Sequence, residues 1–373
     1  MNAYVERLQG YATDWLGPVW GPQAFATGRA LAMIVMVLVP LLLTVLYYQL
    51  VERWVIGWMQ VRKGPNRVGW KGVLQPIADA IKLLLKEQVV PAGANKGLFL
   101  LAPVISVAPA LAAWSIVPFA PGWVISQADA AVLVLLAMTS LGIYGVIIAG
   151  WASNSKYAFL GSMRAAAQMV AYELAMGFAI VGALMAGGSM NLTQIVERQH
   201  TDWGFLGWFW IPLFPLFLVH YIAGLAETNR HPFDVAEGES EIVAGFHVEY
   251  SGMAFAVFFL AEYANMILIS TISPILFWGG WLSPFDFPAV RGSGPALAWL
   301  AAPSVAWLFA KTAFLMFVFL WIRASFPRYR YDQIMRLGWK VFIPVTLVWI
   351  GVVGFAMMEP FAHWPVLRLW FGH

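Results

Sequence analysis

The sequence predicts an all-α polytopic membrane protein with about eight transmembrane helices, some of them kinked, plus an amphipathic interfacial helix and long cytoplasmic loops. Composition is the first observation behind this prediction. Of 373 residues, 61% are apolar and 11% are charged, whereas a soluble domain has about 45–50% apolar and about 25% charged residues. The second observation is a mean hydropathy of +0.73. This shortage of polar surface excludes a soluble multidomain protein, a disordered chain, a collagen-like fibre and a nucleic-acid-binding module.

The third observation is a series of apolar stretches with the length, about 20 residues, that a helix needs to cross a bilayer. We expect them to form a single integral membrane domain over residues 1–373, with spans near 30–51, 98–117, 130–151, 165–187, 205–226, 250–278, 302–322 and 341–358. Prolines within or at the ends of these stretches predict kinked or broken helices; they are Pro103, Pro109, Pro212, Pro215, Pro274 and Pro344.

Basic residues are distributed unequally between the connections. The loops 52–97, 152–164, 227–250 and 323–340 hold 16 Lys and Arg residues, and the segments on the opposite side hold 5. Because cytoplasmic loops are enriched in basic residues, we expect these four loops in the cytoplasm and both termini outside. The N-terminus lacks the pattern of a signal or transit peptide.

The first of these loops predicts an amphipathic helix. From Leu74 onwards, apolar residues fall on one helical face and polar residues on the other, and Pro76 suits a first turn. We expect this helix in the plane of the interface, although a surface helix that merely joins two spans is an alternative. The preceding turn carries Arg62, Lys63 and Arg67, which suit either lipid phosphates or an acidic partner surface.

The third loop, 227–250, is acidic where basic residues should dominate. It holds six acids and one Arg230. If the chain is helical after Pro232, then Asp234, Glu237 and Glu241 share one face. Carboxylates this close cannot all ionise cheaply, so their pKa values should rise and couple, and the cluster could hold and release protons. A solvated acidic loop is the alternative. The last loop, 323–336, is basic and aromatic, which favours anchoring to lipid phosphates.

Ionisable residues also lie within the spans, namely Glu173, Glu262 and Lys311, with Asp129, His220 and Glu227 near span ends. Such groups are costly in a bilayer and are candidates for function. Together they indicate a hydrated polar path; singly, each could be a structural contact. The chain has no Cys, and its six His show no metal-binding spacing, so we expect no metal site and no iron–sulfur cluster held by this chain.

Several motifs carry a resemblance to a known family. They include Gly64-Pro-Asn-Arg-Val-Gly69, Leu74-Gln-Pro-Ile-Ala-Asp-Ala-Ile-Lys-Leu83, Trp151-Ala-Ser-Asn-Ser-Lys-Tyr157, Gly161-Ser-Met-Arg-Ala-Ala-Ala-Gln168, Ala226-Glu-Thr-Asn-Arg230, Ala236-Glu-Gly-Glu-Ser-Glu241, Ala261-Glu-Tyr-Ala-Asn265 and Arg323-Ala-Ser-Phe-Pro-Arg-Tyr-Arg-Tyr-Asp332. Over roughly residues 30–360 the chain resembles one family of membrane subunits of bacterial NADH–quinone oxidoreductase, respiratory complex I. The mitochondrial counterpart of this family is NADH dehydrogenase subunit 1.

The resemblance implies a translocase subunit that joins the membrane arm to the peripheral arm in the bacterial inner membrane, with periplasmic termini. It implies a ubiquinone tunnel and docking surface with Arg53, Arg62, Asp79 and Lys82 as candidate residues. It also implies an acidic connection toward the proton-pumping subunits, formed by Glu173, Glu227, Asp234, Glu237, Glu241 and Glu262. Electrons would arrive from NADH through FMN and iron–sulfur clusters in partner subunits, so this chain alone would hold no catalytic residue. Partners would be other complex I subunits, ubiquinone and membrane lipids.

Three other functions are alternatives. The related membrane subunit of an energy-converting hydrogenase or formate hydrogenlyase has similar loops but no quinone. A proton-coupled secondary transporter would use Glu173, Glu262 and Lys311, but transporters often contain inverted repeats and this sequence shows none. A purely structural anchor would take no part in a quinone site.

Overall fold

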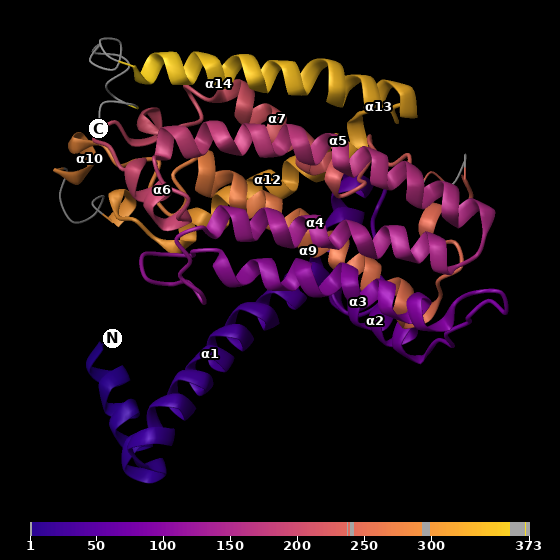
Figure 1. Ribbon diagram of the computed structural model, residues 1–373, viewed down its shortest axis with the longest axis horizontal. Helices are drawn as coiled ribbons and strands as arrows, with labels where there is room; N and C mark the ends of the chain where they lie inside the picture. Colours follow the sequence, from indigo (N-terminus) through magenta and orange to yellow (C-terminus); the bar gives the residue numbers. More distant parts are fainter. Residues whose placement is uncertain (1, 237, 239–241, 293–298, 359–369, 371–373) are drawn as a thin grey trace. The chain divides into compact units, whose positions relative to one another are not determined.

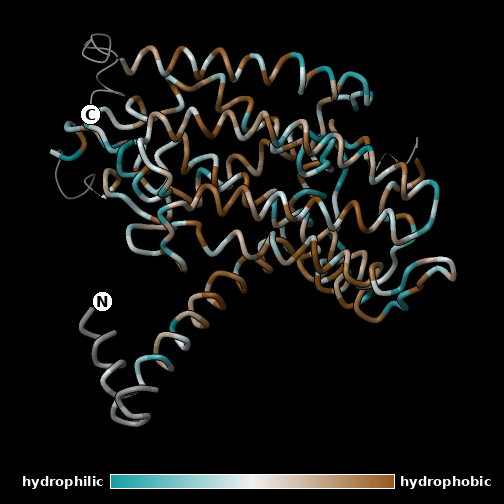
Figure 2. Tube along the Cα trace, viewed as in Figure 1, coloured by the Kyte–Doolittle hydropathy of each residue, from teal (hydrophilic) through white to brown (hydrophobic). Residues whose placement is uncertain are grey.

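The computed structural model of the protein describes residues 2–236, 238, 242–292, 299–358 and 370. Helices make up the fold of this part (Figure 1), and no strand forms in it; Ala120 and Trp123 pair in one isolated bridge. Within the same residues, 7 helices are long and apolar enough to cross a membrane. Hydrophobic residues run along these helices, and hydrophilic residues gather in the connections (Figure 2). The predicted all-α, multi-pass membrane fold is therefore confirmed.

Contacts divide the chain into two units, Met1–Thr44 and Val45–His373. Helix α1 (Asn2–Met59) begins in the first unit and ends in the second. In the first unit the helix breaks at Gly17, whose φ of +81° is left-handed (Figure 1). Only glycine adopts such a conformation at little cost, so Gly17 separates an N-terminal helical segment from the long apolar run that starts near Trp20.

The second unit contains the remaining helices. Its long helices are α3 (Lys96–Ala112), α4 (Ala131–Ala152), α5 (Lys156–Gly187), α9 (Gly252–Phe277), α12 (Val305–Ser325) and α14 (Ile343–Met357). Its shorter elements are α2 (Gln75–Leu85), α6 (Leu192–Arg198), α7 (Phe214–Glu227), α10 (Pro288–Arg291), α13 (Tyr331–Leu337), the 3₁₀ turns at Trp70–Gly72, Ala113–Ile116, Gly204–Gly207 and Gly245–His247, and a π-helix at Gly338–Phe342.

Helix α7 is shorter than the span expected at 205–226. It has 14 residues and begins at Phe214, after a 3₁₀ turn and further turns over 204–213. Pro212 precedes it and Pro215 lies in its first turn. Because proline has no backbone N–H and blocks the preceding helical turn, an α-helix is not continued through this pair. The outcome is a short, buried helix packed between α5 and α9.

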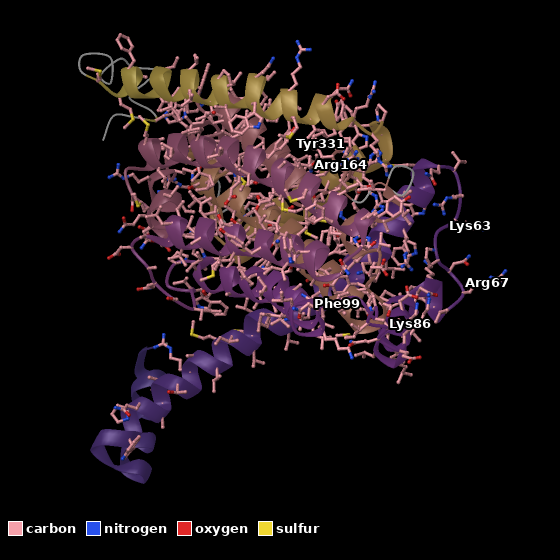
Figure 3. The ribbon with its side chains drawn as sticks, turned by 45° about the vertical axis from the view of Figure 1, so that its right-hand side comes forward. Lys63, Arg67, Lys86, Phe99, Arg164 and Tyr331 are labelled. Atoms are coloured by element: carbon pink, nitrogen blue, oxygen red, sulfur yellow. The ribbon has the colours of Figure 1, made fainter. Side chains whose placement is uncertain are left out.

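Small residues allow the long helices to approach closely. A Cβ added at Gly145 of α4 would lie 2.7 Å from the backbone nitrogen of Ser106 in α3, and one at Gly161 of α5 would lie 2.6 Å from the Cα atom of Gly245. Such contacts are typical of helices that associate in membranes, where close backbone packing replaces hydrophobic burial. Arg164 on α5 also lies over the ring of Tyr331, which links α5 to α13 (Figure 3).

The predicted amphipathic helix forms as α2, and Pro76 lies in its first turn. Its apolar residues Ile77, Ile81, Leu84 and Leu85 are exposed. On its other side Asp79 pairs with Arg53 of α1 at 2.8 Å. The helix therefore turns its apolar face away from the chain, as expected of a helix that lies in a membrane interface. Lys63 and Arg67 lie in the loop before it (Figure 3).

Candidate functional site

Five residues from four parts of the chain form a buried charge cluster: Glu52, Arg230, Glu262, Tyr263 and Arg323. Arg230 lies 3.4 Å from Glu52 Oε1, and its Nε pairs with Glu262. Glu52 also pairs with Arg323 and accepts a hydrogen bond of 2.6 Å from the Tyr263 hydroxyl. The guanidinium of Arg230 lies 4.2 Å from the centre of the Tyr263 ring. Charge pairs and a cation–π contact thus compensate the burial of Glu52 and Arg230, which are 3% and 7% exposed.

The end of α7 positions Arg230. The helix stops at Glu227, and Asn229 takes a left-handed φ of 49°, a conformation that asparagine tolerates better than most residues. Gln168 of α5 then holds the turn, because its amide nitrogen donates to the carbonyl of Ala226 at 2.8 Å and to that of Phe233 at 2.9 Å. A side chain from α5 therefore fixes the backbone on both sides of Arg230.

The loop after α12 supplies cations to the acidic loop. Arg328 donates to Asp234 at 3.0 Å, and the backbone N–H of Tyr329 donates to the Pro232 carbonyl at 3.1 Å. Together with the pair between Glu52 and Arg323 in the last turn of α12, these contacts give two basic residues of 323–336 carboxylate partners in the same chain. Anchoring of the remaining basic residues to lipid phosphates stays a prediction.

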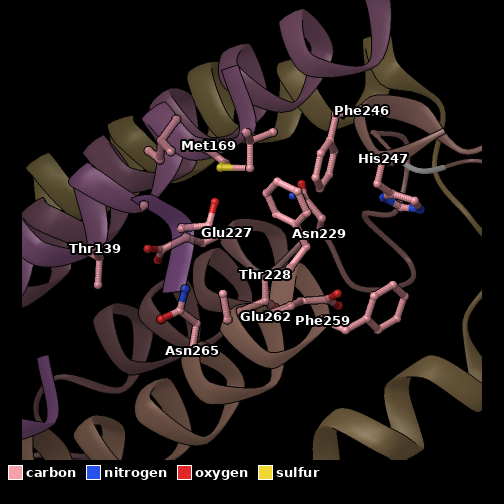
Figure 4. A pocket seen from close by; sticks show the side chains of 16 residues that line it. Thr139, Met169, Glu227, Thr228, Asn229, Phe246, His247, Phe259, Glu262 and Asn265 are labelled. Atoms are coloured by element: carbon pink, nitrogen blue, oxygen red, sulfur yellow. The ribbon is translucent and has the colours of Figure 1, made fainter. Parts of the chain in front are cut away.

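A small cavity adjoins the cluster (Figure 4). Its volume is about 60 Å³, whereas about 10–15 Å³ is enough for one water molecule. The atoms Glu227 Oε2 and Asn265 Oδ1 at its wall are buried and have no hydrogen-bond partner among the described residues. Buried polar atoms of this kind are usually satisfied by ordered water, so the cavity suits a few water molecules. Its other polar lining residues are Ser106, Thr139, Thr228, Asn229, His247 and Glu262.

Glu173 lies on the α4 side of this cavity. Ser140 of α4 donates a hydrogen bond to Glu173 Oε1, and Ser140 follows Thr139, which lines the cavity. Glu173 is half-buried within α5, a helix long and apolar enough to span a membrane. Three carboxylates, Glu262, Glu227 and Glu173, are therefore placed at or beside one polar cavity by α9, α7 and α5.

The structure places the predicted site residues in two groups. Glu227 and Glu262 line the cavity, Glu173 lies beside it, and Asp234 pairs with Arg328. Glu237 and Glu241 lie outside the described residues. The second group, Arg53, Arg62, Asp79 and Lys82, lies on and around α2 and is not part of the described cavity lining: Arg53 pairs with Asp79, Arg62 donates to Gln60, and Lys82 is exposed.

Sequence reasoning did not select Glu52, Tyr263 or Arg323 as site residues. Glu52 and Arg323 each follow an apolar stretch, where a charge is ordinarily a water-facing end of a span. A signal for Glu52 was present in its charge, because an acid at the end of a span on the predicted basic side of the membrane needs a positively charged partner. Residues 233–236 form turns and bends, so Asp234 does not lie on a helix; Glu237 and Glu241, which were expected to share its face, lie outside the described residues.

His247 belongs to the turn that closes the cavity and lies outside the long helices. Its ring contacts Phe246, Phe255 and Phe259, with ring centres 5.0, 5.4 and 6.1 Å away. Burial among these rings lowers the pKa of His247 to about 4. The folded protein therefore keeps this imidazole neutral at pH values where an exposed histidine, with a pKa of about 6.5, is already protonated.

A pH-dependent loss of stability is expected from His247. Below pH 6.5 His247 takes up a proton in the unfolded chain, whereas in the folded chain it does so only near pH 4. The free energy of unfolding therefore falls as the pH falls. Between pH 7.5 and 5.5 this group should contribute a loss of about 1 kcal/mol. Thermal unfolding of the purified protein in detergent at both pH values measures the loss. His247→Phe should lose less stability than the wild type over this interval, and an equal loss contradicts the prediction.

Fold and site together define a class: a multi-pass α-helical membrane protein that buries paired carboxylates and arginines beside a small polar cavity. Residues 32–354 match the sequence model of the NADH dehydrogenase family. The chain belongs to this family, which is that of subunit 1 of respiratory complex I. It is thus a membrane subunit of a multisubunit, complex I-type NADH dehydrogenase.

Proposed function

We propose that this subunit forms part of a ubiquinone-binding tunnel and couples the reduction of quinone to proton translocation. The observation that carries the proposal is the buried charge cluster beside the cavity, because from its member Glu262 further carboxylates follow at and beside the cavity, Glu227 on α7 and Glu173 on α5. An ionisable group at such depth is costly and is retained where it carries charge or protons. A subunit that only anchored its partners would need none of these groups.

Iron–sulfur clusters fit this chain poorly. It has no cysteine, the ligand that holds most iron–sulfur clusters, and its described residues contain no group of three or more His, Cys, Asp or Glu suited to a metal ion. We therefore assign FMN and the iron–sulfur clusters to partner subunits and treat ubiquinone as the substrate. In this subunit the residues act on protons and charge.

Quinone reduction changes local charge transiently, because the quinone that has gained electrons is negatively charged until it takes up the two protons that complete the neutral quinol. Negative charge developing near the acidic loop attracts Arg328 and Arg230 away from Asp234 and Glu262. Glu262, losing its cation, takes up a proton, which passes through cavity water to Glu227 and on to Glu173. The loop and the carboxylates respond as one element whose protonation biases the neighbouring subunits.

Neutralising two of these acids tests the proposal. Glu227→Gln and Asp234→Asn keep the side-chain shapes but remove the charge. We expect coupled NADH–quinone turnover to fall on the order of tenfold, less than the factor of about 10²–10⁴ typical of a group that transfers a proton in the transition state. Assembly should persist, because Gln and Asn still form hydrogen bonds. Turnover with quinone, turnover with an artificial electron acceptor and proton pumping are compared in the same membranes.

Asp332→Asn is the matched control for these variants. Asp332 is 77% exposed and lies 3.8 Å from Arg330, so its neutralisation should leave turnover unchanged. Normal quinone turnover and normal proton pumping in both Glu227→Gln and Asp234→Asn would refute the role assigned to these acids.

The residues around α2 are proposed to frame the quinone entrance and a docking surface for the peripheral arm. Arg53, Arg62, Asp79 and Lys82 place charges beside the exposed apolar face of α2, which suits a lipid-borne quinone with a polar head. Crosslinking with a photoreactive quinone tests this, and labelling confined to other subunits contradicts it. We also propose the bacterial inner membrane, with the basic loops cytoplasmic and both termini periplasmic.

A further inference from the structure

His247 brings an imidazole to the wall of the cavity that holds Glu227 and Glu262. It lies outside the long helices, in the 3₁₀ turn Gly245–His247, and is 9% exposed. This turn lies against α5, since a Cβ added at Gly161 would come 2.6 Å from the Cα atom of Gly245. The close approach holds the backbone that carries His247 in place at the cavity, and the proposed function assigns this residue no role.

His247 lies at the opposite end of the cavity from Thr139, and Glu227 lies between them (Figure 4). Phe246 and Phe259 also line the cavity, and their ring centres lie 5.0 and 6.1 Å from that of the imidazole. A phenylalanine ring has no exchangeable proton, whereas a neutral imidazole has one nitrogen that accepts a proton and one that donates. His247 thus gives this end of the cavity a group that can transfer protons.

The segment around His247 runs between the surface of the subunit and the cavity. It belongs to the loop 227–250, which the distribution of basic residues predicts on the cytoplasmic side. Val243, four positions before His247, is 55% exposed. His247 therefore follows a surface residue closely in the chain and lines the cavity in which the proposed function has Glu262 take up a proton.

The titratable groups that face His247 across the cavity are acids. Glu262 of α9 pairs with Arg230, and Glu227 is the last residue of α7. The helices α3, α4 and α5 contribute residues that do not titrate to the described lining, namely Ser106, Thr139, Gly142, Ile143, Val146 and Met169. A proton released from the imidazole into the cavity therefore meets carboxylates that can accept it.

We propose that His247 is the relay through which protons from the cytoplasmic side enter the cavity during quinone reduction. One ring nitrogen accepts a proton from water at the loop, and the other nitrogen releases its proton to cavity water, which passes it to Glu262. The imidazole stays neutral overall, no electron moves, and a half-turn of the ring restores the starting arrangement. The inference rests on the proposed function, to which it adds the source of the proton.

The surroundings of the ring suit a relay better than a store of protons. Burial lowers the pKa of His247 to about 4. The ring is therefore neutral near pH 7 and keeps one accepting and one donating nitrogen. A histidine with a higher pKa would hold the proton that it has to pass on.

His247→Gln tests the relay in membranes that contain the whole complex. Glutamine keeps a polar side chain, but its amide is too weakly basic to take up a proton. NADH–quinone turnover per assembled complex is measured at pH 6 and pH 8.5. At pH 8.5 we expect a loss on the order of tenfold relative to the wild type, less than the factor of about 10²–10⁴ typical of general acid–base groups, because cavity water still admits some protons. At pH 6 the loss should be smaller, because hydronium is more abundant.

His247→Phe keeps the proposal testable if His247→Gln does not assemble. Phenylalanine preserves the packing against the neighbouring rings, and we expect the same pH-dependent loss of turnover. His200→Gln is the matched control, because His200 is 50% exposed, pairs with Asp286 and is not part of the described cavity lining. Its turnover should equal that of the wild type at both pH values.

Two results overturn the relay. One is wild-type turnover at pH 8.5 in an assembled His247 variant. The other is a loss of equal size at pH 6 and pH 8.5, because a purely structural defect does not depend on the supply of protons. Glu227→Gln and Asp234→Asn, measured alongside, separate the two failures. If they lose turnover while the His247 variants do not, only the relay is wrong; normal turnover and pumping in both refute the proposed function itself.

Discussion

Replacing Arg230 with methionine is expected to lower the equilibrium constant for folding and assembly of this subunit by about two to three powers of ten, and with it the amount of quinone-reducing complex. Methionine retains the volume of the side chain but leaves Glu262 without the cation that it contacts, in a site where Glu52 is 3% exposed. Removing one partner of a buried ion pair costs about 3–5 kcal/mol, because the other charge remains desolvated. Native gels and NADH–quinone turnover of the same membranes measure the loss.

Two further variants show whether the unpaired carboxylate is the cause. Combining Arg230→Met with Glu262→Gln should recover part of the assembly, because the remaining side chain is neutral. Arg330→Met should have little effect, because Arg330 is 81% exposed and its distance to Asp332 is 3.8 Å. If Arg230→Met assembles and turns over as Arg330→Met does, the cluster does not hold the loop through these charges.

Gly161→Ala is expected to have the second largest effect. Its new Cβ would lie 2.6 Å from the Cα atom of Gly245 and 2.8 Å from the backbone nitrogen of Phe246. Backbone atoms cannot rotate away, so α5 and the turn Gly245–His247 have to separate. We expect a loss of about 1–3 kcal/mol, as for other overpacked sites, with reduced quinone turnover because this turn closes the cavity.

Gly177→Ala on the same helix is the matched control. Nothing lies within 4 Å of a Cβ added at Gly177, and alanine favours a helix over glycine by about 0.5–1 kcal/mol. The control should therefore be neutral or stabilising in thermal unfolding of the subunit within the purified complex. Equal unfolding midpoints for the two alanine variants contradict the close approach of α5 and the turn.

Local patterns predicted the elements whose structure depends on local forces. The periodicity from Leu74 predicted α2, because apolar residues three and four positions apart in the sequence lie on one face of a helix. Hydropathy predicted the long helices for the same reason. At α7 the apolar run was correct but the helix was too long, since Pro212 and Pro215 delay its start until Phe214.

The charge cluster could not be derived from local patterns, because its partners are far apart in sequence: Arg230 and Glu52 are separated by 178 positions. Periodicity also could not show that turns follow Pro232. There the side-chain amide of Gln168 donates a hydrogen bond to the Phe233 carbonyl, so a contact with a distant part of the chain stabilises the local backbone conformation. Glu227 and Glu262 were selected from the sequence because a charged residue within or at the end of an apolar stretch stands out even when its partner is unknown.

The hold of Gln168 on the loop has a mechanical consequence. One amide nitrogen joins the carbonyls of Ala226 and Phe233, so neither end of that stretch can move away from α5 without loosening the other. Partial opening would leave buried carbonyls unsatisfied, which is costly. The segment that carries Arg230 is therefore expected to stay bound to α5 at both ends or to separate from it at both ends together.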